Sequence, residues 1–126
     1  VHMRYSMDKV GKALSSFTTI KQALAAVRDA LVAHMDAYEK CNMLHGDVSI
    51  GNIMFYADEG DAVSGCLNDW DLSLSSPVIA SGVRQLSRPG TWQFMSIHIL
   101  QNPTLPEGVS DDVESFLWVV LQLALR

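Results

Sequence analysis

The stretch Leu44-His45-Gly46-Asp47-Val48-Ser49-Ile50-Gly51-Asn52-Ile53-Met54 places an acid and an amide, five residues apart, between two apolar runs. The first apolar run ends at His45, and the chain becomes apolar again over residues 53–56. This layout is typical of a loop that holds polar groups over a cleft while hydrophobic neighbours on both sides fix it. We therefore expect Asp47 and Asn52 to lie together in a functional loop.

A second acid, Asp69, follows Asn52 by seventeen positions, at the end of a short apolar run. Asp, Asn and Asp in this order match the nucleotide-metal site of protein kinases. There, one Asp orients the attacking hydroxyl, and the Asn and the second Asp bind magnesium. Carboxylate and amide oxygens are the hard ligands that Mg²⁺ requires. The pattern favours phosphoryl transfer that uses ATP and Mg²⁺.

The composition describes one folded domain of modest size. The chain has 126 residues, of which 48% are hydrophobic and 18% are charged, so it is neither disordered nor fibrous. The net charge is −5, and no basic stripe with interleaved aromatic residues is present, which argues against nucleic acid as a partner. Cys41 and Cys66 lack metal-ligand spacing and are predicted to be free, mostly buried thiols in a reducing compartment.

No segment has the pattern of a signal peptide or a membrane span. The N-terminus lacks a continuous apolar core. The longest apolar run, residues 116–125, is interrupted by Gln122 and is far shorter than the ~20 residues that cross a bilayer. We expect a soluble intracellular protein, cytoplasmic or nuclear, with no membrane partner.

An amphipathic helix is predicted from about Thr19 to Lys40. Its apolar residues recur at spacings of three and four, which lines one face that we expect to pack on a core: Ile20, Leu24, Val27, Leu31, Met35 and Tyr38. Thr19 with Gln22 fits a capping box. On this alignment His34 lies on the surface, as does His2.

A β-hairpin is predicted over residues 53–68, with an acidic turn at 58–61. This turn lacks the spaced ligands and the closing Glu of a calcium loop. Residues 69–90 are irregular, and so long a loop in a compact domain is either functional or disordered.

A second helix is predicted to begin at Ser110, a good N-cap, with acids in its first turn. From Val113 to Leu125 it is apolar on almost all faces, so we expect burial all round. The chain stops at Arg126 without a capping Gly, which indicates a fragment of a larger domain. The aromatic residues Trp92, Phe94 and Trp118 are interpreted as core rather than ligand contacts.

Four features in order resemble the C-terminal lobe of a eukaryotic-type protein kinase, and more closely the fungal-type protein-kinase-like family. They are the loop 45–52, the triplet 69–71, the stretch Gly-Thr-Trp-Gln-Phe-Met-Ser at 90–96 and the helix start Asp-Asp-x-Glu-Ser at 111–115. The resemblance runs from about Val10 to the last residue. It implies a mainly α fold with a small β-hairpin, an incomplete, protein-kinase-like C-terminal lobe (α+β). On this interpretation residues 1–126 are a partial kinase domain, from the helix before the catalytic loop to the central buried helix.

The resemblance also implies roles for single residues. Asp47 is the catalytic-loop Asp that orients the substrate hydroxyl or accepts its proton. Asn52 binds one magnesium and steadies the loop, and Asp69 binds the metal that bridges the nucleotide phosphates. His45 is structural, packing under the metal triplet and fixing the loop backbone.

Two further contacts are implied near the second helix. Asp112 is expected to be a buried carboxylate that accepts hydrogen bonds from the backbone around His45 and Gly46, since a buried charge needs partners. Thr91 is expected to contact Asp47. The implied partners are ATP and a protein substrate that is phosphorylated on Ser or Thr.

The sequence departs from the kinase pattern at four positions. Gly46 replaces the Arg that usually pairs with a phosphate, so we predict that phosphorylation within 73–91 is not the on-switch. Ser49 stands where many kinases place a phosphate-contacting Lys. Asp71 replaces a Gly and should stiffen the hinge there. His98 replaces the Glu that closes the activation segment with a buried ion pair.

The 126 residues contain no Gly-rich loop before residue 19 and no Val-Ala-x-Lys strand. The N-terminal lobe that covers ATP is therefore absent, and we expect this polypeptide alone to be inactive or nearly so. Two alternatives remain open: a small-molecule kinase of the aminoglycoside or choline type, which also carries His-Gly-Asp and Asp-Trp-Asp, and a non-catalytic pseudokinase or binding module. The run around Ser49 is not the Gly-x-Ser-x-Gly of a hydrolase, which argues against a Ser nucleophile.

Overall fold

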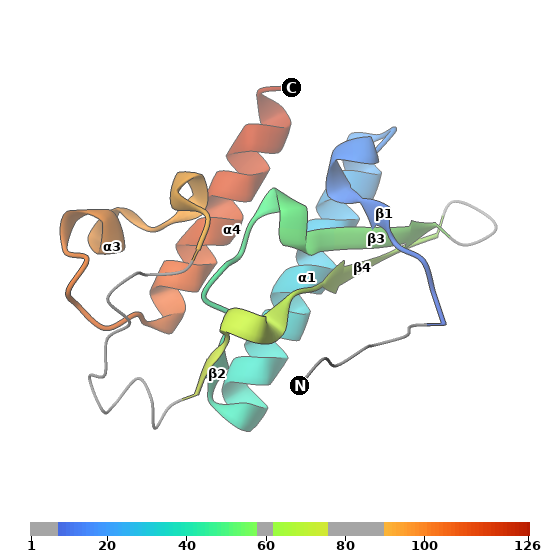
Figure 1. The fold of residues 1–126 in the computed structure, drawn as a ribbon. Helices are drawn as coiled ribbons and strands as arrows, with labels where there is room; N and C mark the ends of the chain where they lie inside the picture. Colours follow the sequence, from blue (N-terminus) through green and yellow to red (C-terminus); the bar gives the residue numbers. More distant parts are fainter. Residues whose placement is uncertain (1–7, 58–61, 76–89) are drawn as a thin grey trace, which may run out of the picture.

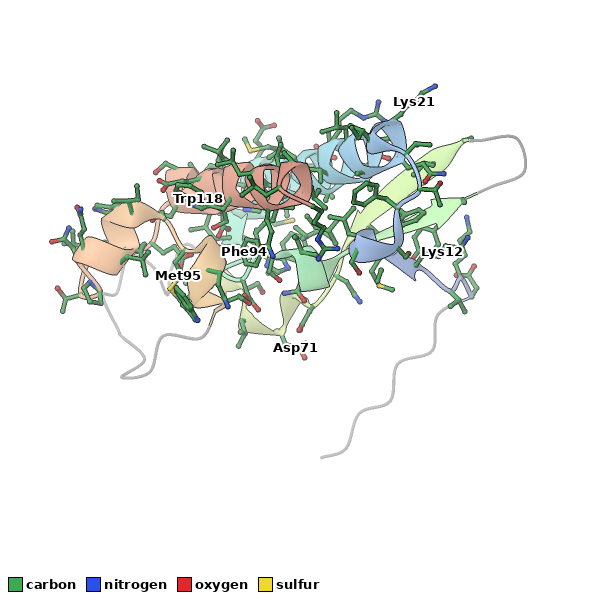
Figure 2. The ribbon with its side chains drawn as sticks, turned by 90° about the horizontal axis from the view of Figure 1, so that it is seen from above. Lys12, Lys21, Asp71, Phe94, Met95 and Trp118 are labelled. Atoms are coloured by element: carbon green, nitrogen blue, oxygen red, sulfur yellow. The ribbon has the colours of Figure 1, made fainter. Side chains whose placement is uncertain are left out.

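The computed structural model describes residues 8–57, 62–75 and 90–126, and it shows an α+β fold (Figure 1). Its helices are α1 (Ile20–Cys41), α3 (Ile97–Gln101) and α4 (Val109–Ala124). One antiparallel sheet has the strand order β1 (Lys12–Ala13), β3 (Ile53–Ala57) and β4 (Val63–Leu67), and a smaller one pairs β2 (Met43–Leu44) with β5 (Leu74–Ser75). Helices α1 and α4 lie together along one side of the molecule, and the hairpin and the loops lie on the other (Figure 2).

Helix α1 agrees with its predicted limits to within one residue at each end. The Thr19 hydroxyl accepts the N–H of Gln22 at 3.2 Å, as the capping box requires. The Gln22 side chain reaches Thr18 rather than the Thr19 backbone. Asn42 ends the helix in the left-handed conformation, with φ 50° and ψ 42°, a common helix stop for Asn. The cap therefore turns the chain directly into β2 and the loop that follows.

The predicted buried face of α1 was wrong by about one position. Ile20 is 71% exposed and Leu24 is 49% exposed. Val27 is buried as predicted, but the other buried residues were not predicted and are mainly small: Ala23, Ala26, Ala30 and His34. Small side chains let β4 approach very closely, because a Cβ placed on Gly65 would lie 2.2 Å from the Ala26 carbonyl oxygen. His34 is therefore fully buried, and its assignment to the surface was also wrong.

The hairpin forms as predicted, with β3 and β4 paired from Ile53 opposite Leu67 to Ala57 opposite Val63. Its expected acidic turn lies outside the described residues. The segment before α1 contributes more than a lead-in, because β1 pairs with β3 and the turn after it buries Leu14 completely. The hydrophobic core thus lies between α1, α4 and the three-stranded sheet.

Helix α4 begins earlier than predicted and is buried on one face only. Gly108, not Ser110, is the N-cap, and the Asp111 side chain accepts the N–H of Gly108 at 2.8 Å. The inner face packs Phe116, Val119 and Leu123 into the core, whereas the outer face leaves several apolar side chains substantially exposed: Val113, Leu117, Leu121 and Leu125. The prediction of all-round burial was therefore wrong for this chain, because α1 and residues 92–94 cover only one side of the helix.

Two other predictions concern aromatic and sulfur side chains. Phe94 is buried in the core as predicted, and Trp118 is half-buried against it. Trp92 is 68% exposed, so its assignment to the core was wrong. Both thiols are free, but Cys41 is exposed at the end of α1 and Cys66 is half-buried, so burial was overestimated. Among the described residues, no helix is long and apolar enough to cross a membrane.

Candidate functional site

The loop between β2 and β3 brings Asp47 and Asn52 into contact. The Asn52 side-chain amide donates to the Asp47 carbonyl oxygen at 2.8 Å and to Asp47 Oδ2 at 3.1 Å. The short 3-10 turn Ile50–Asn52 produces this approach, because it folds the four residues between Asp47 and Asn52 back on themselves. Since Asn52 Nδ2 is used for these bonds, its Oδ1 is the atom left to face a ligand.

Asp69 lies at the same end of the hairpin as Asn52. The Asn68 N–H donates to the Asn52 carbonyl at 2.8 Å, directly beyond the last pair of the β3–β4 ladder. Asp69 then adopts φ 60° and ψ 64°, a conformation that is uncommon for a residue with a side chain and that often marks functional sites. Its side chain is exposed and has no hydrogen bond within the described parts of the chain.

His45 connects the loop to the residues around Asp69. Its Nδ1 accepts the Asp47 N–H at 3.2 Å, so its Nε2 carries the proton and donates to the Asn68 carbonyl at 2.8 Å. The fully buried ring also meets the edge of Trp70, with the ring centroids 4.7 Å apart. These contacts agree with the structural position expected for His45, under the triplet and against the loop backbone.

Asp112, at the start of α4, fixes the loop from the other side. Its carboxylate is 1% exposed and accepts the N–H of His45 at 2.8 Å and the N–H of Gly46 at 3.2 Å. The expected backbone contacts are therefore present. Asp112 Oδ2, which accepts the His45 N–H, also lies 2.7 Å from His34 Nε2. Helix α1, the loop and helix α4 therefore meet at one buried carboxylate.

Sequence reasoning missed His34 as a partner of Asp112. Its Nδ1 is buried and has no hydrogen-bond partner among the described residues, and its ring meets the edge of Phe116. The signal that could have found it is its register, because His34 continues the stripe of Ala23, Ala26 and Ala30 along one face of α1.

Gly46 occupies its position for a structural reason. It adopts φ 78°, and a Cβ there would lie 3.2 Å from the Leu72 carbonyl oxygen. A side chain at this position would be strained by the backbone angle and crowded by the residues before β5. The backbone conformation and the close Leu72 carbonyl therefore favour Gly at this position.

Thr91 reaches Asp47 from the far end of the chain. Its N–H and its hydroxyl both donate to Asp47 Oδ1, at 2.8 Å and 2.9 Å. Because Asn52 donates to Oδ2, both carboxylate oxygens of Asp47 are hydrogen-bonded and the side chain is held in one orientation. The predicted contact between Thr91 and Asp47 is present.

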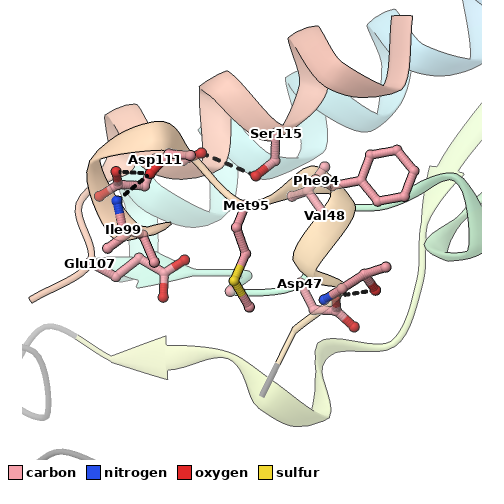
Figure 3. Close-up of a pocket in the computed structure, with 11 residues that line it drawn as sticks. Asp47, Val48, Phe94, Met95, Ile99, Glu107, Asp111 and Ser115 are labelled. Carbon is pink, nitrogen blue, oxygen red and sulfur yellow. Dashed lines mark hydrogen bonds between the residues drawn. The ribbon is translucent and has the colours of Figure 1, made fainter. Parts of the chain in front are cut away.

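A small pocket, with a volume of about 10 Å³, opens beside Asp47 (Figure 3). We call it the Asp47 pocket; its lining residues are Gly46, Asp47, Val48, Thr91, Phe94, Met95, Ser96, Ile99, Glu107, Asp111 and Ser115. In the close-up, Asp47 and Asp111 lie on opposite sides and Met95 lies between them. Asn52 and Asp69 do not line this pocket. Asp47 therefore lies between two regions of the site, the pocket on one side and the end of the hairpin with Asn52 and Asp69 on the other.

The residues predicted to bind magnesium, Asn52 and Asp69, supply one amide oxygen and one carboxylate, and Asp47 beside Asn52 adds a second carboxylate. Within residues 8–57, 62–75 and 90–126 there is no group of three or more His, Cys, Asp or Glu side chains that could hold a metal ion. A metal at this end of the hairpin would therefore depend on the Asn52 amide together with Asp47 and Asp69. The oxygen donor set and the free Asn52 Oδ1 suit Mg²⁺, which keeps several waters and takes few protein ligands.

The comparison with known families agrees with this reading of the loop and helix motifs. A family model described as fungal protein kinase matches residues 1–124, nearly the whole chain. The match places the chain among kinase-like proteins, and the chain belongs to the fungal protein kinase family. No curated protein matches the chain.

Proposed function

We propose that this chain supplies the metal-binding and acceptor-binding regions of a kinase site that transfers a phosphoryl group from ATP to a Ser or Thr hydroxyl of a protein substrate. The observation that carries the proposal is the restraint of Asp47, whose two carboxylate oxygens are held by Asn52 and Thr91. Phosphoryl transfer depends on positioning and charge neutralisation more than on covalent chemistry, so a fixed carboxylate beside a pocket is the expected arrangement.

Each residue then has a defined task. Asp47 orients the acceptor hydroxyl in the Asp47 pocket and accepts its proton, and Thr91 keeps Oδ1 in place for this. Asn52 Oδ1 and Asp69 would hold Mg²⁺, which neutralises phosphate charge when it is bound. His45 and Asp112 preserve the loop conformation through its backbone.

Phosphorylation within residues 73–91 is not the on-switch in this proposal. Gly46 has no side chain to pair with a phosphate, and its φ of 78° disfavours any residue that would have one. Because the chain contains neither a Gly-rich loop nor a Val-Ala-x-Lys strand, we expect it to show little or no phosphoryl transfer alone.

A metal-binding measurement tests the proposal without requiring turnover. In this measurement Mn²⁺ takes the place of Mg²⁺, because Mn²⁺ broadens the NMR signals of backbone amides near its binding site. The titration is carried out with and without ATP. We expect the amides of Asp47, Asn52 and Asp69 to broaden first, and Asp69→Asn to weaken Mn²⁺ binding at least about tenfold, because losing a direct ligand costs no less than losing a supporting one. Asp71→Asn is the matched control, since Asp71 is also exposed and only two residues away. Equal weakening by both variants would contradict the proposal.

The class of acceptor is tested by measuring phosphoryl transfer, and this measurement uses the full-length protein. Phosphorylation of a protein rather than of choline or an aminoglycoside would support the protein-kinase assignment over the small-molecule alternative. Loss of that activity in Asp47→Asn, with Mn²⁺ binding otherwise intact, would separate an enzyme from a non-catalytic pseudokinase.

A further inference from the structure

The first turn of α4 carries two neighbouring acids, and they contact different segments. Asp112 binds the loop, whereas the side chain of Asp111 faces the segment from Gly90 to Gln101, here called the 90–101 segment. Asp111 is only 5% exposed, and it lines the Asp47 pocket opposite Asp47 (Figure 3). A carboxylate that is buried this far requires hydrogen-bond partners.

The partners of Asp111 are concentrated on one short stretch. Ser96 Oγ, which is also buried, donates to Asp111 Oδ1 at 2.5 Å, and the same Ser96 Oγ accepts the N–H of Ile99 at 3.1 Å as the N-cap of α3. His98 Nδ1 lies 3.3 Å from the same carboxylate oxygen. Oδ2 accepts the N–H of Gly108. Asp111 thus fastens the start of α3 to the start of α4.

Glu114 adds a second attachment one turn further along α4. Its Oε1 accepts the N–H of Ile97 at 2.9 Å and the indole N–H of Trp118 at 3.2 Å. These bonds are more exposed than those of Asp111, so they are expected to contribute less. The 90–101 segment is thus attached to two acids of α4, Asp111 and Glu114.

The link continues from Ser96 to the functional end of the segment. Between Thr91 and Ser96 the backbone forms a tight 3-10 turn, in which the Phe94 N–H donates to the Thr91 carbonyl at 2.9 Å. The Phe94 side chain is buried in the core and anchors this turn. Few degrees of freedom remain between the Ser96–Asp111 bond and the two bonds from Thr91 to Asp47.

We infer that Asp111 is a positioning residue that seats Thr91 on Asp47 by fixing Ser96. Without the Ser96–Asp111 bond the start of α3 loses its buried attachment, and Thr91 loses the fixed base from which it reaches Asp47. The inference rests on the proposed function for its meaning in catalysis. The structural part of the inference, that Asp111 controls the contact between Thr91 and Asp47, does not depend on phosphoryl transfer.

The control of the Thr91–Asp47 contact by Asp111 is tested on this chain by amide hydrogen exchange, measured by NMR. We expect Ser96→Ala and Asp111→Ala each to raise the exchange rate of the Thr91 amide about tenfold or more, because each removes a buried bond of order 1 kcal/mol or more. The Gly65 amide, bonded to Asp29, reports any general loss of stability and should not change. Ser110→Ala is the matched control, since Ser110 is exposed and lies next to Asp111.

The outcomes separate this inference from the proposed function. An unchanged Thr91 exchange rate in both variants, or an equal rise at Gly65, overturns the inference whatever the metal measurement shows. If Thr91 exchange rises as expected, the full-length protein gives the catalytic readout. There Asp111→Ala should raise the KM for the acceptor severalfold and leave the KM for ATP unchanged, and a change confined to ATP would contradict the positioning role.

Discussion

Two segments reach Asp47 from opposite sides, and they are attached to α4 in different ways. The loop after β2 is held through backbone N–H groups that donate to the buried Asp112, whereas the buried attachment of the 90–101 segment is a side chain, the Ser96 hydroxyl on Asp111. The one backbone N–H described from this segment to an acid of α4, from Ile97 to Glu114, is exposed. Backbone donors persist through any substitution in the loop except Pro, so the loop depends on one acceptor in α4. The side-chain attachment, in contrast, is lost when one atom, Ser96 Oγ, is removed by substitution. The comparison indicates that the loop is part of the fold, while the segment can be loosened without unfolding it.

The largest effect is expected when the acceptor of the loop is removed. Asp112→Asn replaces one of the two acceptor oxygens by an amide N–H₂, which then faces a backbone N–H of His45 or Gly46, and it leaves His34 without its carboxylate partner. Breaking one side of a buried charged network typically costs about 3–5 kcal/mol. We expect a loss of that size in the free energy of unfolding, measured by urea denaturation. A loss below about 1 kcal/mol would show that the loop does not depend on Asp112.

The next largest effect tests how much the fold depends on the close packing between α1 and the hairpin. Gly65→Ala places a Cβ 2.2 Å from the Ala26 carbonyl oxygen, and this atom belongs to a helix backbone that cannot move alone. Overpacking of this kind typically costs about 1–3 kcal/mol, and we expect a loss in that range.

A second glycine provides the control for that measurement. Gly51→Ala adds the same methyl group to the loop, but its nearest neighbour would be Ser49 Oγ at 3.7 Å, an ordinary contact. We expect its effect to stay within about 0.5 kcal/mol. Equal losses in the two variants would mean that the tight approach of β4 to α1 is not a special constraint.

The parts of the fold that were predicted correctly have strong local signals. The limits of α1 follow from a clear period and an N-cap at Thr19, and the hairpin follows from two apolar runs around an acidic turn. The contact between Asp47 and Asn52 was expected from their position between apolar anchors. The contacts of Thr91 and Asp112 were expected only from the family resemblance, because they join positions more than forty residues apart.

The failures arose where two patterns compete on one helix. In α1 the large apolar residues, such as Ile20 and Leu24, outweigh the alanine stripe in any hydrophobicity count, yet only the alanines permit the close approach of β4. In α4 apolar residues surround the helix, and nothing local shows which face the core covers. Which face is buried depends on tertiary partners, and the position of His34 could not be fixed without knowing that face.

The smallest expected effect lies at the hairpin and sharpens the contrast with the 90–101 segment. Asp29 Oδ2 accepts the Gly65 N–H at 2.9 Å, and this backbone hydrogen bond, opposed by partial burial and helped by Arg28, lowers the pKa of Asp29 below its ordinary 3.8. A lowered pKa in the folded state stabilises the protein above the unfolded-state pKa, and this contribution is lost as the pH falls through the folded-state value. We expect Asp29→Asn to cost about 0.5–1 kcal/mol at pH 7, and the difference from the parent chain to shrink below about pH 4. Urea denaturation at both pH values measures this difference, and the Thr91 amide should exchange at the same rate in both proteins at pH 7. A difference that grows with acid would reverse the sign of the linkage and remove Asp29 as an attachment of the hairpin to α1.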